Sequence, residues 1–370
     1  MSFEDITGQT YAKALIEAWL QSGRVPHALL FSGPSGTGKR QLALALCKAL
    51  NCQSPGVLAC DHCTSCRRMA QFSHPDLHAL VPLGPRRGKS HSDNAREVMH
   101  QAVQEYLQQE GAPNYGNVNI AREHLDQLQR DMGYAPVEGP YKLALIFDAE
   151  AMHPAGANAL LKTLEEPSGS AVFILISTAP ERLLPTVLSR CQSIPLRRLN
   201  QVDLRRHLQD AGVAAERLEL AVRLGGGSLQ RAMQVAEGAF EEECSWVEEF
   251  LGAAARGEEG VYWELLDEMG VRTERGQLVR FLEMCGSYLR DLFLLNLDCK
   301  REVTHVDRLE WMRQMQACFS REQIEAAAVE VDRAAAHVAR NVNGGLVLVD
   351  LWRYLSGRRS RQPVASIGAG

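Results

Sequence analysis

A glycine-rich loop carries the clearest chemical signal in the chain. It reads Gly33-Pro34-Ser35-Gly36-Thr37-Gly38-Lys39-Arg40, follows an apolar stretch at 27–32 and opens a helical pattern. Glycines let backbone N–H groups converge on phosphate oxygens, the helix N-terminus adds partial positive charge, and Lys39 supplies a charge for the outer phosphates. The pattern predicts a nucleotide-binding loop; the alternative is a glycine-rich turn without function.

Two positions depart from the pattern of an active phosphate-loop ATPase. Arg40 stands where Ser or Thr normally holds Mg²⁺, and a guanidinium cannot ligate a cation. A second apolar run, 142–147, ends at Asp148, which suits a carboxylate for the metal's water shell or, alternatively, a helix cap. Ala149 replaces the usual water-polarising Glu, and Glu150 would point to the other side of an extended backbone. The sequence leaves open whether ATP or ADP binds, and it predicts that ATP hydrolysis is lost.

Four cysteines predict a metal site. Cys52, Cys60, Cys63 and Cys66 form the spacing C-x7-C-x2-C-x2-C, which brings four thiolates to one tetrahedral ion and leaves no open position. The predicted ion is a structural Zn²⁺, with an iron–sulfur cluster as the alternative. The other six of the ten cysteines are scattered and are interpreted as ordinary thiols of a reducing compartment.

Three further polar residues are ambiguous by themselves. Thr178 follows the apolar stretch 173–177, Arg190 lies in Ser189-Arg190-Cys191, and Arg231 comes soon after a run of glycines. A lone arginine after an apolar stretch is usually a solvated side chain. These positions need support from outside the local pattern.

The order of elements predicts an α/β region followed by an all-α region. Apolar runs at 27–32, 142–147 and 171–177 alternate with helical patterns at 39–50 and 155–166, as in a parallel sheet with right-handed crossovers. Residues 84–116 are polar and basic at first, then helical in pattern, then rich in Gly, Pro and Asn. They are interpreted as a polar insertion or a long exposed excursion without assigned chemistry.

Strand signals disappear after residue 200. Residues 201–237 predict two helices separated by Gly225-Gly226-Gly227, and the patterns at 278–297, 321–340 and 346–355 predict a helical bundle. The basic tail at 357–370 has too little apolar surface to order itself.

Composition places the chain among globular proteins. It has 370 residues, 45% of them hydrophobic, with 40 basic and 45 acidic residues and a net charge of -5. This length predicts two or three domains. No apolar run exceeds six residues and the first residues do not resemble a signal peptide, so we expect a cytoplasmic protein with no membrane contact. The acidic balance excludes a histone-like binder, and any contact with DNA must use a local basic face or partner subunits.

Taken together, these motifs resemble the bacterial DNA polymerase III clamp loader within the AAA+ ATPase family, most closely the delta prime subunits. The similarity is dense up to about residue 235 and architectural beyond it. It is carried by residues 3–9, 27–31, 33–40, the cysteine knuckle, 74–76, 180–191, 341–343 and Asn158-Ala159-Leu160-Leu161-Lys162-Thr163-Leu164-Glu165-Glu166-Pro167.

The resemblance implies three domains. They are an AAA+ nucleotide-binding domain at 1–198 with a zinc knuckle at 52–66, a helical lid at 199–240, and a helical collar at 241–356 that joins a ring of five subunits including gamma/tau and delta. The ring would open a sliding clamp and place it around primed DNA. Arg190 would act in trans as an arginine finger on a neighbour's ATP, and Thr178 and Arg231 would join the loop and Asp148 in nucleotide binding.

The expected function is therefore that of a delta prime-like subunit without ATPase activity of its own. Both catalytic motifs depart from the active pattern, and we expect the protein to lack the long C-terminal extension of some motor subunits. The first alternative is an active gamma/tau-like motor ATPase. The others are a non-replicative scaffold built on the zinc knuckle and helices, and a small-molecule kinase.

Overall fold

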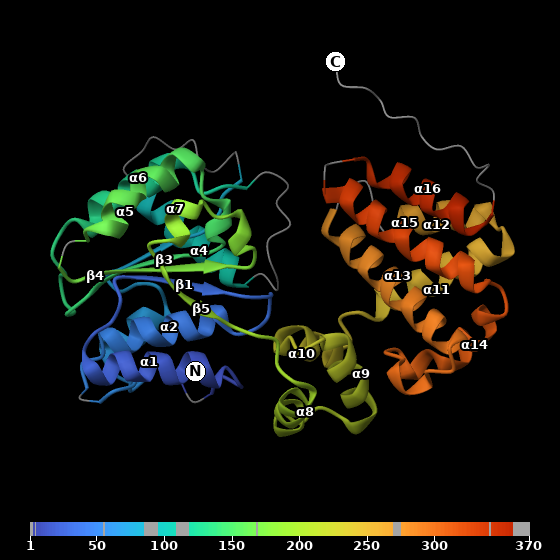
Figure 1. Ribbon diagram of the computed structural model, residues 1–370, viewed down its shortest axis with the longest axis horizontal. Coiled ribbons are helices and arrows are strands. Elements are labelled where there is room, and N and C mark those ends of the chain that lie inside the picture. Colours follow the sequence, from blue (N-terminus) through green and yellow to red (C-terminus); the bar gives the residue numbers. More distant parts are fainter. Residues whose placement is uncertain are drawn as a thin grey trace, which may run out of the picture. The chain divides into compact units, whose positions relative to one another are not determined.

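The computed structural model describes the chain except for residues 1, 2, 4, 55, 85–94, 109–117, 168, 269–274, 340, 341 and 358–370. The described chain forms two compact units, labelled by element in Figure 1. The first comprises Met1–Ala211 and Gly226–Arg231, and the second comprises Gly212–Gly225 and Ala232–Gly370. The following paragraphs treat each unit by itself.

A parallel five-stranded sheet forms the centre of the first unit. Its strand order is β2-β3-β4-β1-β5, with every pairing parallel. The bounds are β1 Ala28–Ser32, β2 Leu77–Leu80, β3 Lys142–Ile146, β4 Ala171–Ser177 and β5 Gln192–Pro195. Every residue of β1, β3 and β4 is buried, which explains why these strands are continuous apolar runs in the sequence.

Helices cover both faces of this sheet. In Figure 1, α1 and α2 lie on one side and α5 and α6 on the other. The bounds in this unit are α1 Thr10–Ser22, α2 Lys39–Leu50, α3 Thr64–Ala70, α4 Ala95–Gln108, α5 Arg122–Met132, α6 Pro154–Glu165, α7 Pro185–Leu188 and α8 Gln201–Asp210, with short 3₁₀ turns η1 Ala149–Ala151 and η2 Pro180–Arg182. The strand–helix alternation confirms the predicted α/β fold class.

The predicted polar insertion at 84–116 needs correction where the structure describes it. Within it, α4 is not an exposed excursion, because Met99, Val103 and Tyr106 are buried in the core of the first unit. The predicted helical stretch in its middle is present as α4, but the prediction that the segment is exposed did not use the helical spacing of these apolar side chains. The rest of the predicted insertion, apart from Gly84, lies outside the described residues.

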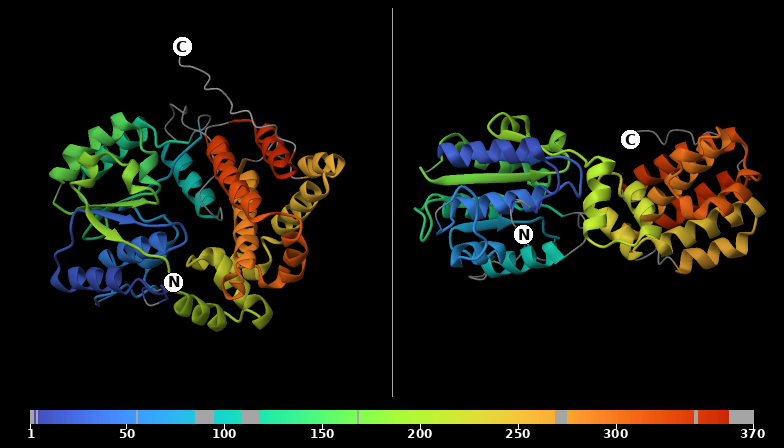
Figure 2. Two further views of the ribbon diagram at one scale, coloured as in Figure 1. Left: turned by 45° about the vertical axis from the view of Figure 1, so that its right-hand side comes forward. Right: turned by 90° about the horizontal axis from the view of Figure 1, so that it is seen from below.

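The second unit is helical throughout its described part. Its helices are α9 Ala215–Gly225, most of α10 Leu229–Glu237, α11 Glu241–Arg256, α12 Glu259–Glu268, α13 Arg275–Asn296, α14 Leu309–Gln316, α15 Arg321–Ala339 and α16 Gly344–Leu355, with 3₁₀ turns η3 Lys300–Glu302 and η4 Val306–Arg308. The long helix α13 packs along α15, and α15 packs along α16 (Figures 1 and 2). Phe250 and Phe281 meet edge to face in its core, with ring centroids 5.4 Å apart.

The region predicted as two helices after residue 200 contains three, α8, α9 and α10. Gly212 takes a left-handed φ of +80°, just after α8 ends, and this is the helix stop that the prediction missed. The structure divides residues 199–240 between its two compact units. The boundaries 1–198, 199–240 and 241–356 therefore stay predictions.

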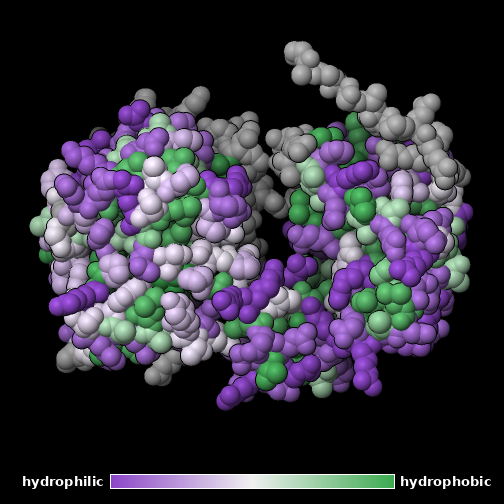
Figure 3. Space-filling view, in the orientation of Figure 1, coloured by the Kyte–Doolittle hydropathy of each residue, from purple (hydrophilic) through white to green (hydrophobic). Residues whose placement is uncertain are grey.

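The surface and the helices agree with the composition. In the view of Figure 3 most of the surface is hydrophilic, with hydrophobic residues interspersed. Among the described residues, no helix has the length and apolar character needed to cross a membrane. The predicted disordered tail at 357–370 lies outside the described residues from 358 onward.

Candidate functional site

The glycine-rich loop joins β1 to α2 and depends on glycine at two crowded points. A Cβ atom on Gly36 would lie 1.8 Å from Oγ of Ser228, and one on Gly33 would lie 2.2 Å from the backbone oxygen of Leu196. Gly36 also has a left-handed φ of +72°. Side chains at these positions would displace backbone or a buried serine, so the loop keeps its backbone N–H groups accessible only with glycine.

Lys39 is buried at the start of α2. Its Nζ donates hydrogen bonds of 2.6 Å to the backbone oxygens of both Gly33 and Pro34. Burial, and then the neighbouring Arg40 charge, lower the pKa of Lys39 to about 8. The ammonium therefore lies inside the loop that would surround a phosphate.

Arg40, Tyr106 and Asp148 form a chain of polar contacts beside the loop. Arg40 Nη2 donates to the Tyr106 hydroxyl at 2.6 Å, and that hydroxyl donates to Asp148 Oδ2 at 2.6 Å. The Arg40 guanidinium carbon also lies 4.2 Å from the centroid of the Tyr106 ring. Burial, and then the Asp148 charge, raise the pKa of Tyr106, so its hydroxyl stays protonated and donates. The carboxylate predicted to serve a metal thus has a hydroxyl donor and, next to that donor, a cation.

Glu150 lies nearer to the loop than the sequence predicted. Asp148 has a left-handed φ of 44° and is followed by η1, so the backbone after β3 is not extended. Glu150 Oε1 accepts hydrogen bonds from the Thr178 N–H at 3.0 Å and from its hydroxyl at 2.8 Å. Its Oε2 is buried without a hydrogen-bond partner in the described part of the chain. The expectation that Glu150 points away from the site is wrong.

These elements enclose what we call the phosphate-loop cavity, with a volume of about 470 Å³. Most of the predicted nucleotide-binding residues line it: Gly36, Thr37, Gly38, Lys39, Arg40, Asp148 and Thr178. Two predicted residues do not. Gly33 contributes the oxygen that binds Lys39, and Arg231 lies just past the lining residues Leu229 and Gln230, its N–H donating to Ser228 Oγ at 3.2 Å.

Sequence reasoning missed Tyr106, Phe72 and Phe147, which lie in or beside this cavity. Phe72 and Phe147 line the cavity, and their ring centroids are 6.1 Å apart. Tyr106 is 66 residues from Arg40 and 42 from Asp148. No local motif connects Tyr106 or Phe72 with the loop, so only the fold identifies them, whereas Phe147 directly precedes the predicted Asp148.

Arg190 lies at the surface of the first unit, outside the phosphate-loop cavity. Its side chain is 30% exposed. The guanidinium forms an ion pair with Glu165, donating from Nε at 2.6 Å and also from Nη2, while Nη1 donates to the backbone oxygen of Thr186 at 2.9 Å. An exposed pair of this kind contributes about 1 kcal/mol or less to stability.

The four predicted metal-binding cysteines converge. The Sγ atoms of Cys52, Cys60, Cys63 and Cys66 all lie within 4.8 Å of one another. Backbone N–H groups donate to three of these sulfurs: Cys60 N–H to Cys52, Cys63 N–H to Cys60, and Cys66 N–H to Cys63. Hydrogen bonds, first from the Ser54 side chain and then from backbone N–H groups, lower the pKa of Cys60 to about 5. Thiolates in this arrangement fit one tetrahedral metal ion.

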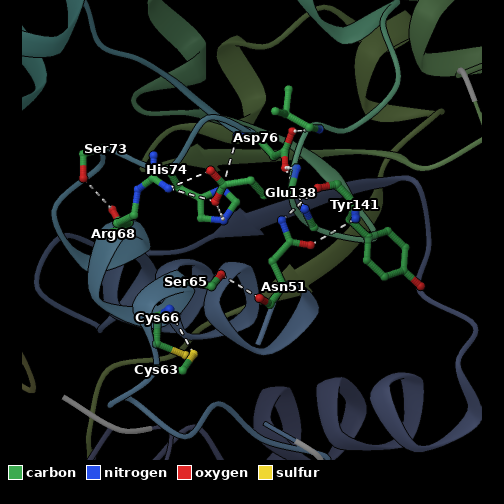
Figure 4. A network of polar contacts seen from close by, with 12 residues as sticks. Asn51, Cys63, Ser65, Cys66, Arg68, Ser73, His74, Asp76, Glu138 and Tyr141 are labelled. Carbon is green, nitrogen blue, oxygen red and sulfur yellow. Dashed lines mark hydrogen bonds and ion pairs between the residues drawn. The ribbon is translucent and has the colours of Figure 1, made fainter. Parts of the chain in front are cut away.

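A polar network holds this knuckle to the sheet (Figure 4). Ser65, in α3, donates to the backbone oxygen of Asn51 at 2.6 Å, and the Asn51 side chain forms two hydrogen bonds with the backbone of Tyr141, just before β3. Arg68 donates to both oxygens of Glu138 at 2.8 Å. The cysteine site therefore has a fixed position at the β2–β3 side of the sheet.

A buried carboxylate, Asp76, completes the network. It is fully buried and accepts hydrogen bonds from the N–H groups of Val137, Glu138 and Gly139 at 2.6–2.8 Å. Burial alone would raise its pKa, but the three N–H groups outweigh burial and hold the pKa below its ordinary value. Asp76 thereby fixes the segment that precedes β3.

The parallel sheet, the phosphate loop at the end of β1 and the helical second unit together define an AAA+ ATPase fold. A solved structure of a DNA polymerase III gamma subunit-related protein from Thermotoga maritima aligns with 93% of this chain and 99% of that chain, with a TM-score of 0.50 and 14% sequence identity. At this identity the match concerns the fold alone.

Sequence comparison identifies the family. The family described as DNA polymerase III, delta subunit matches residues 8–200, and the chain belongs to this AAA+ clamp-loader family. The chain is 24% identical over 325 residues to DNA polymerase III subunit delta′ of Bacillus subtilis, covering 88% of this chain and 89% of that protein. It is 32% identical over 243 residues to subunit gamma/tau of Mycobacterium tuberculosis, covering 64% of this chain but only 36% of that protein.

Proposed function

We propose that this chain is a delta prime-like subunit of a bacterial DNA polymerase III clamp loader, acting in the cytoplasm. It helps a five-subunit ring with gamma/tau and delta subunits to place a sliding clamp on primed DNA. It does not hydrolyse ATP, and it donates Arg190 to the ATP site of a neighbouring subunit. Its four-cysteine knuckle holds a structural Zn²⁺.

The chain of contacts from Arg40 through Tyr106 to Asp148 is the observation that carries this proposal. A motor ATPase needs a hydroxyl and a carboxylate for Mg²⁺ beside its phosphate loop. Here a guanidinium replaces the hydroxyl, and the carboxylate accepts the Tyr106 hydroxyl instead. The loop and Lys39, which would bind phosphate, are present. The groups that would hold Mg²⁺ for hydrolysis are replaced.

One relative supports the delta prime assignment over gamma/tau. The match to the Bacillus subtilis delta′ protein extends over 88% of this chain, and therefore into its C-terminal helices, whereas the gamma/tau match covers 64% and the match to the Pseudomonas aeruginosa delta′ protein covers 62%. A subunit that shares the helical region can share its role in assembly. The proposed partner subunits, the sliding clamp and the DNA contact are all inferred from that similarity alone.

The position of Arg190 supports its role in trans. It lies outside the chain's own phosphate-loop cavity and is partly exposed, so it cannot act on a nucleotide held there without leaving its place. A guanidinium stays charged at every physiological pH and matches phosphate oxygens with two parallel hydrogen bonds. Exchange of Glu165 for a neighbour's phosphate would complete that neighbour's site.

Two measurements on the purified chain test the proposal. Isolated chain should hydrolyse ATP no faster than buffer, with or without primed DNA, and tagged chain should capture gamma/tau and delta subunits from a mixture of the purified proteins. Rapid ATP hydrolysis by the isolated chain would contradict the proposed loss of the groups that support hydrolysis. Failure to capture either subunit would contradict the clamp-loader role and favour a scaffold outside replication.

One observation favours an active ATPase as the second candidate. Glu150 Oε2 is buried without a hydrogen-bond partner among the described residues, and Glu150 Oε1 binds Thr178, which lines the phosphate-loop cavity. A carboxylate next to this lining residue could polarise water. This candidate predicts ATP turnover by the isolated chain that Glu150→Gln abolishes while nucleotide binding remains. Equal and negligible turnover in both proteins would exclude it.

A further inference from the structure

The residues beside the phosphate loop do not fit a magnesium ion. The fold family implies Mg²⁺ with its nucleotide, held by a hydroxyl after the loop lysine and by a carboxylate at the end of the neighbouring strand. In this chain Arg40 follows Lys39 and offers only N–H donors, which repel rather than ligate a cation. The carboxylate of Asp148 is already engaged by Tyr106 at 2.6 Å.

In the absence of a nucleotide, the charges near the loop are balanced without a metal ion. Lys39 and Arg40 bring two positive charges to the phosphate-loop cavity, and Asp148 and Glu150 act electrostatically on Lys39 with two negative charges. A divalent cation in this group would lie close to the Arg40 guanidinium, where like charges repel strongly in a partly buried environment. The arrangement therefore disfavours Mg²⁺ twice, by ligand type and by charge.

Aromatic side chains of the core hold Arg40 in position. Its guanidinium packs 4.2 Å from the Tyr106 ring centroid and 6.0 Å from that of Phe147, and it donates to the Tyr106 hydroxyl. Tyr106 is 3% exposed and Phe147 is 1% exposed. That bond uses one of the five N–H donors of a guanidinium, so others are available to an anion in the cavity.

We propose that the phosphate-loop cavity binds a nucleoside di- or triphosphate without a divalent cation, with the Arg40 guanidinium in the place of the metal ion. The inference rests on the proposed function only in taking this loop as a nucleotide site. A cavity of about 470 Å³ lies within the range of small-ligand sites. Phosphate oxygens would contact the loop N–H groups, Lys39 and Arg40, and the metal-dependent positioning that hydrolysis requires would be absent.

Nucleotide binding in the presence and absence of metal tests the inference. A fluorescent ADP is titrated with the full chain in buffer that contains either 5 mM (roughly saturating) Mg²⁺ or excess EDTA. Wild-type protein should bind with dissociation constants that agree within about threefold, because the arginine charge replaces the ion. Arg40→Ser, which restores the hydroxyl, should bind at least about tenfold more tightly with Mg²⁺ than with EDTA.

Three further variants keep the result interpretable. Arg40→Lys retains a cation and should keep metal-independent binding, which covers the case in which Arg40→Ser fails to fold. Lys39→Ala should lose binding in both buffers, and Arg122→Ser, on the exposed surface of α5, should match wild type.

The outcomes separate this inference from the proposed function. Wild-type binding that is tenfold or more tighter with Mg²⁺ would overturn the inference, and so would no binding in either buffer. Capture of gamma/tau and delta subunits by the same preparation would show in either case that the clamp-loader role stands independently of the nucleotide.

Discussion

Lys39 shows how burial lowers the pKa of a single residue in the proposed phosphate site. With a pKa of about 8, it is charged at neutral pH and loses its charge as pH rises through that value. Affinity for ADP should therefore be roughly tenfold lower at pH 9 than at pH 7, because only about a tenth of the protein then carries the ammonium before binding. Fluorescence titration across this pH range measures the effect.

A lysine-to-arginine exchange is the matched control for this titration. Lys39→Arg replaces the titrating ammonium by a guanidinium that stays charged throughout the range. Its affinity, whatever its absolute value, should be constant from pH 7 to pH 9. A constant affinity in the wild-type protein would show that the charge of Lys39 does not contribute to binding.

The four clustered cysteines form the second residue-scale site. If Cys52, Cys60, Cys63 and Cys66 hold one Zn²⁺, the purified protein should contain about one equivalent of zinc, and Cys63→Ser should lower that content severely. The exposed Cys299 provides the control, since Cys299→Ser should leave the zinc content unchanged. Metal analysis of the three proteins decides the matter; detection of iron with acid-labile sulfide would instead support the iron–sulfur alternative.

At the scale of elements, the sequence predicts the buried parts of the sheet and misses its edges. The strands β1, β3 and β4 consist of buried residues only and stand out as apolar runs. The edge strand β5 has a single buried residue, Ile194, and the other edge strand, β2, has four residues. Such short or half-exposed strands carry too little pattern to be distinguished from loops.

The candidate site likewise contains residues that the sequence predicts and residues that it misses. The phosphate loop and the cysteine knuckle are contiguous in sequence, so their spacing alone predicts them. Tyr106 reaches the site on α4 from a distant part of the chain, and Glu150 reaches it because Asp148 adopts a left-handed conformation. Neither the long-range contact nor that backbone conformation has a local sequence signal, since both depend on tertiary packing.

Asp76 couples elements through one buried carboxylate. Its pKa lies below the ordinary value, so its contribution to stability is fully present above about pH 4 and is lost as pH falls through the folded-state pKa. Asp76→Asn should lower the free energy of unfolding by about 1–3 kcal/mol at pH 7, and the difference from wild type should shrink below pH 4. Denaturant unfolding at several pH values measures both.

An exposed aspartate provides the comparison for Asp76. Asp210→Asn, at the end of α8, should change the free energy of unfolding by less than about 0.5 kcal/mol at any of these pH values. If Asp76→Asn behaves like Asp210→Asn, the three N–H contacts to Asp76 do not stabilise the fold.

At the scale of the whole molecule, the proposed function gives the phosphate loop and Arg190 different roles. In the proposed function, the first unit holds a phosphate loop that does not support hydrolysis and donates the partly exposed Arg190 to a neighbour. The chain as a whole is acidic, with a net charge of -5, so contact with DNA must come through a local basic face or through partner subunits. The proposed function is thus a property of an assembly, and its decisive test uses the assembly.

Steady-state ATP hydrolysis by the reconstituted clamp loader, stimulated by clamp and primed DNA, tests the central claim most directly. The loader is assembled with wild-type chain, with Arg190→Ala, or with the control Arg122→Ala, whose arginine is exposed and forms an ion pair with Asp126 on its own helix. With Arg190→Ala the account predicts intact assembly and a rate lowered by about 10³-fold or more at the affected site. Equal rates for all three loaders would contradict the donation of Arg190 to a neighbouring subunit.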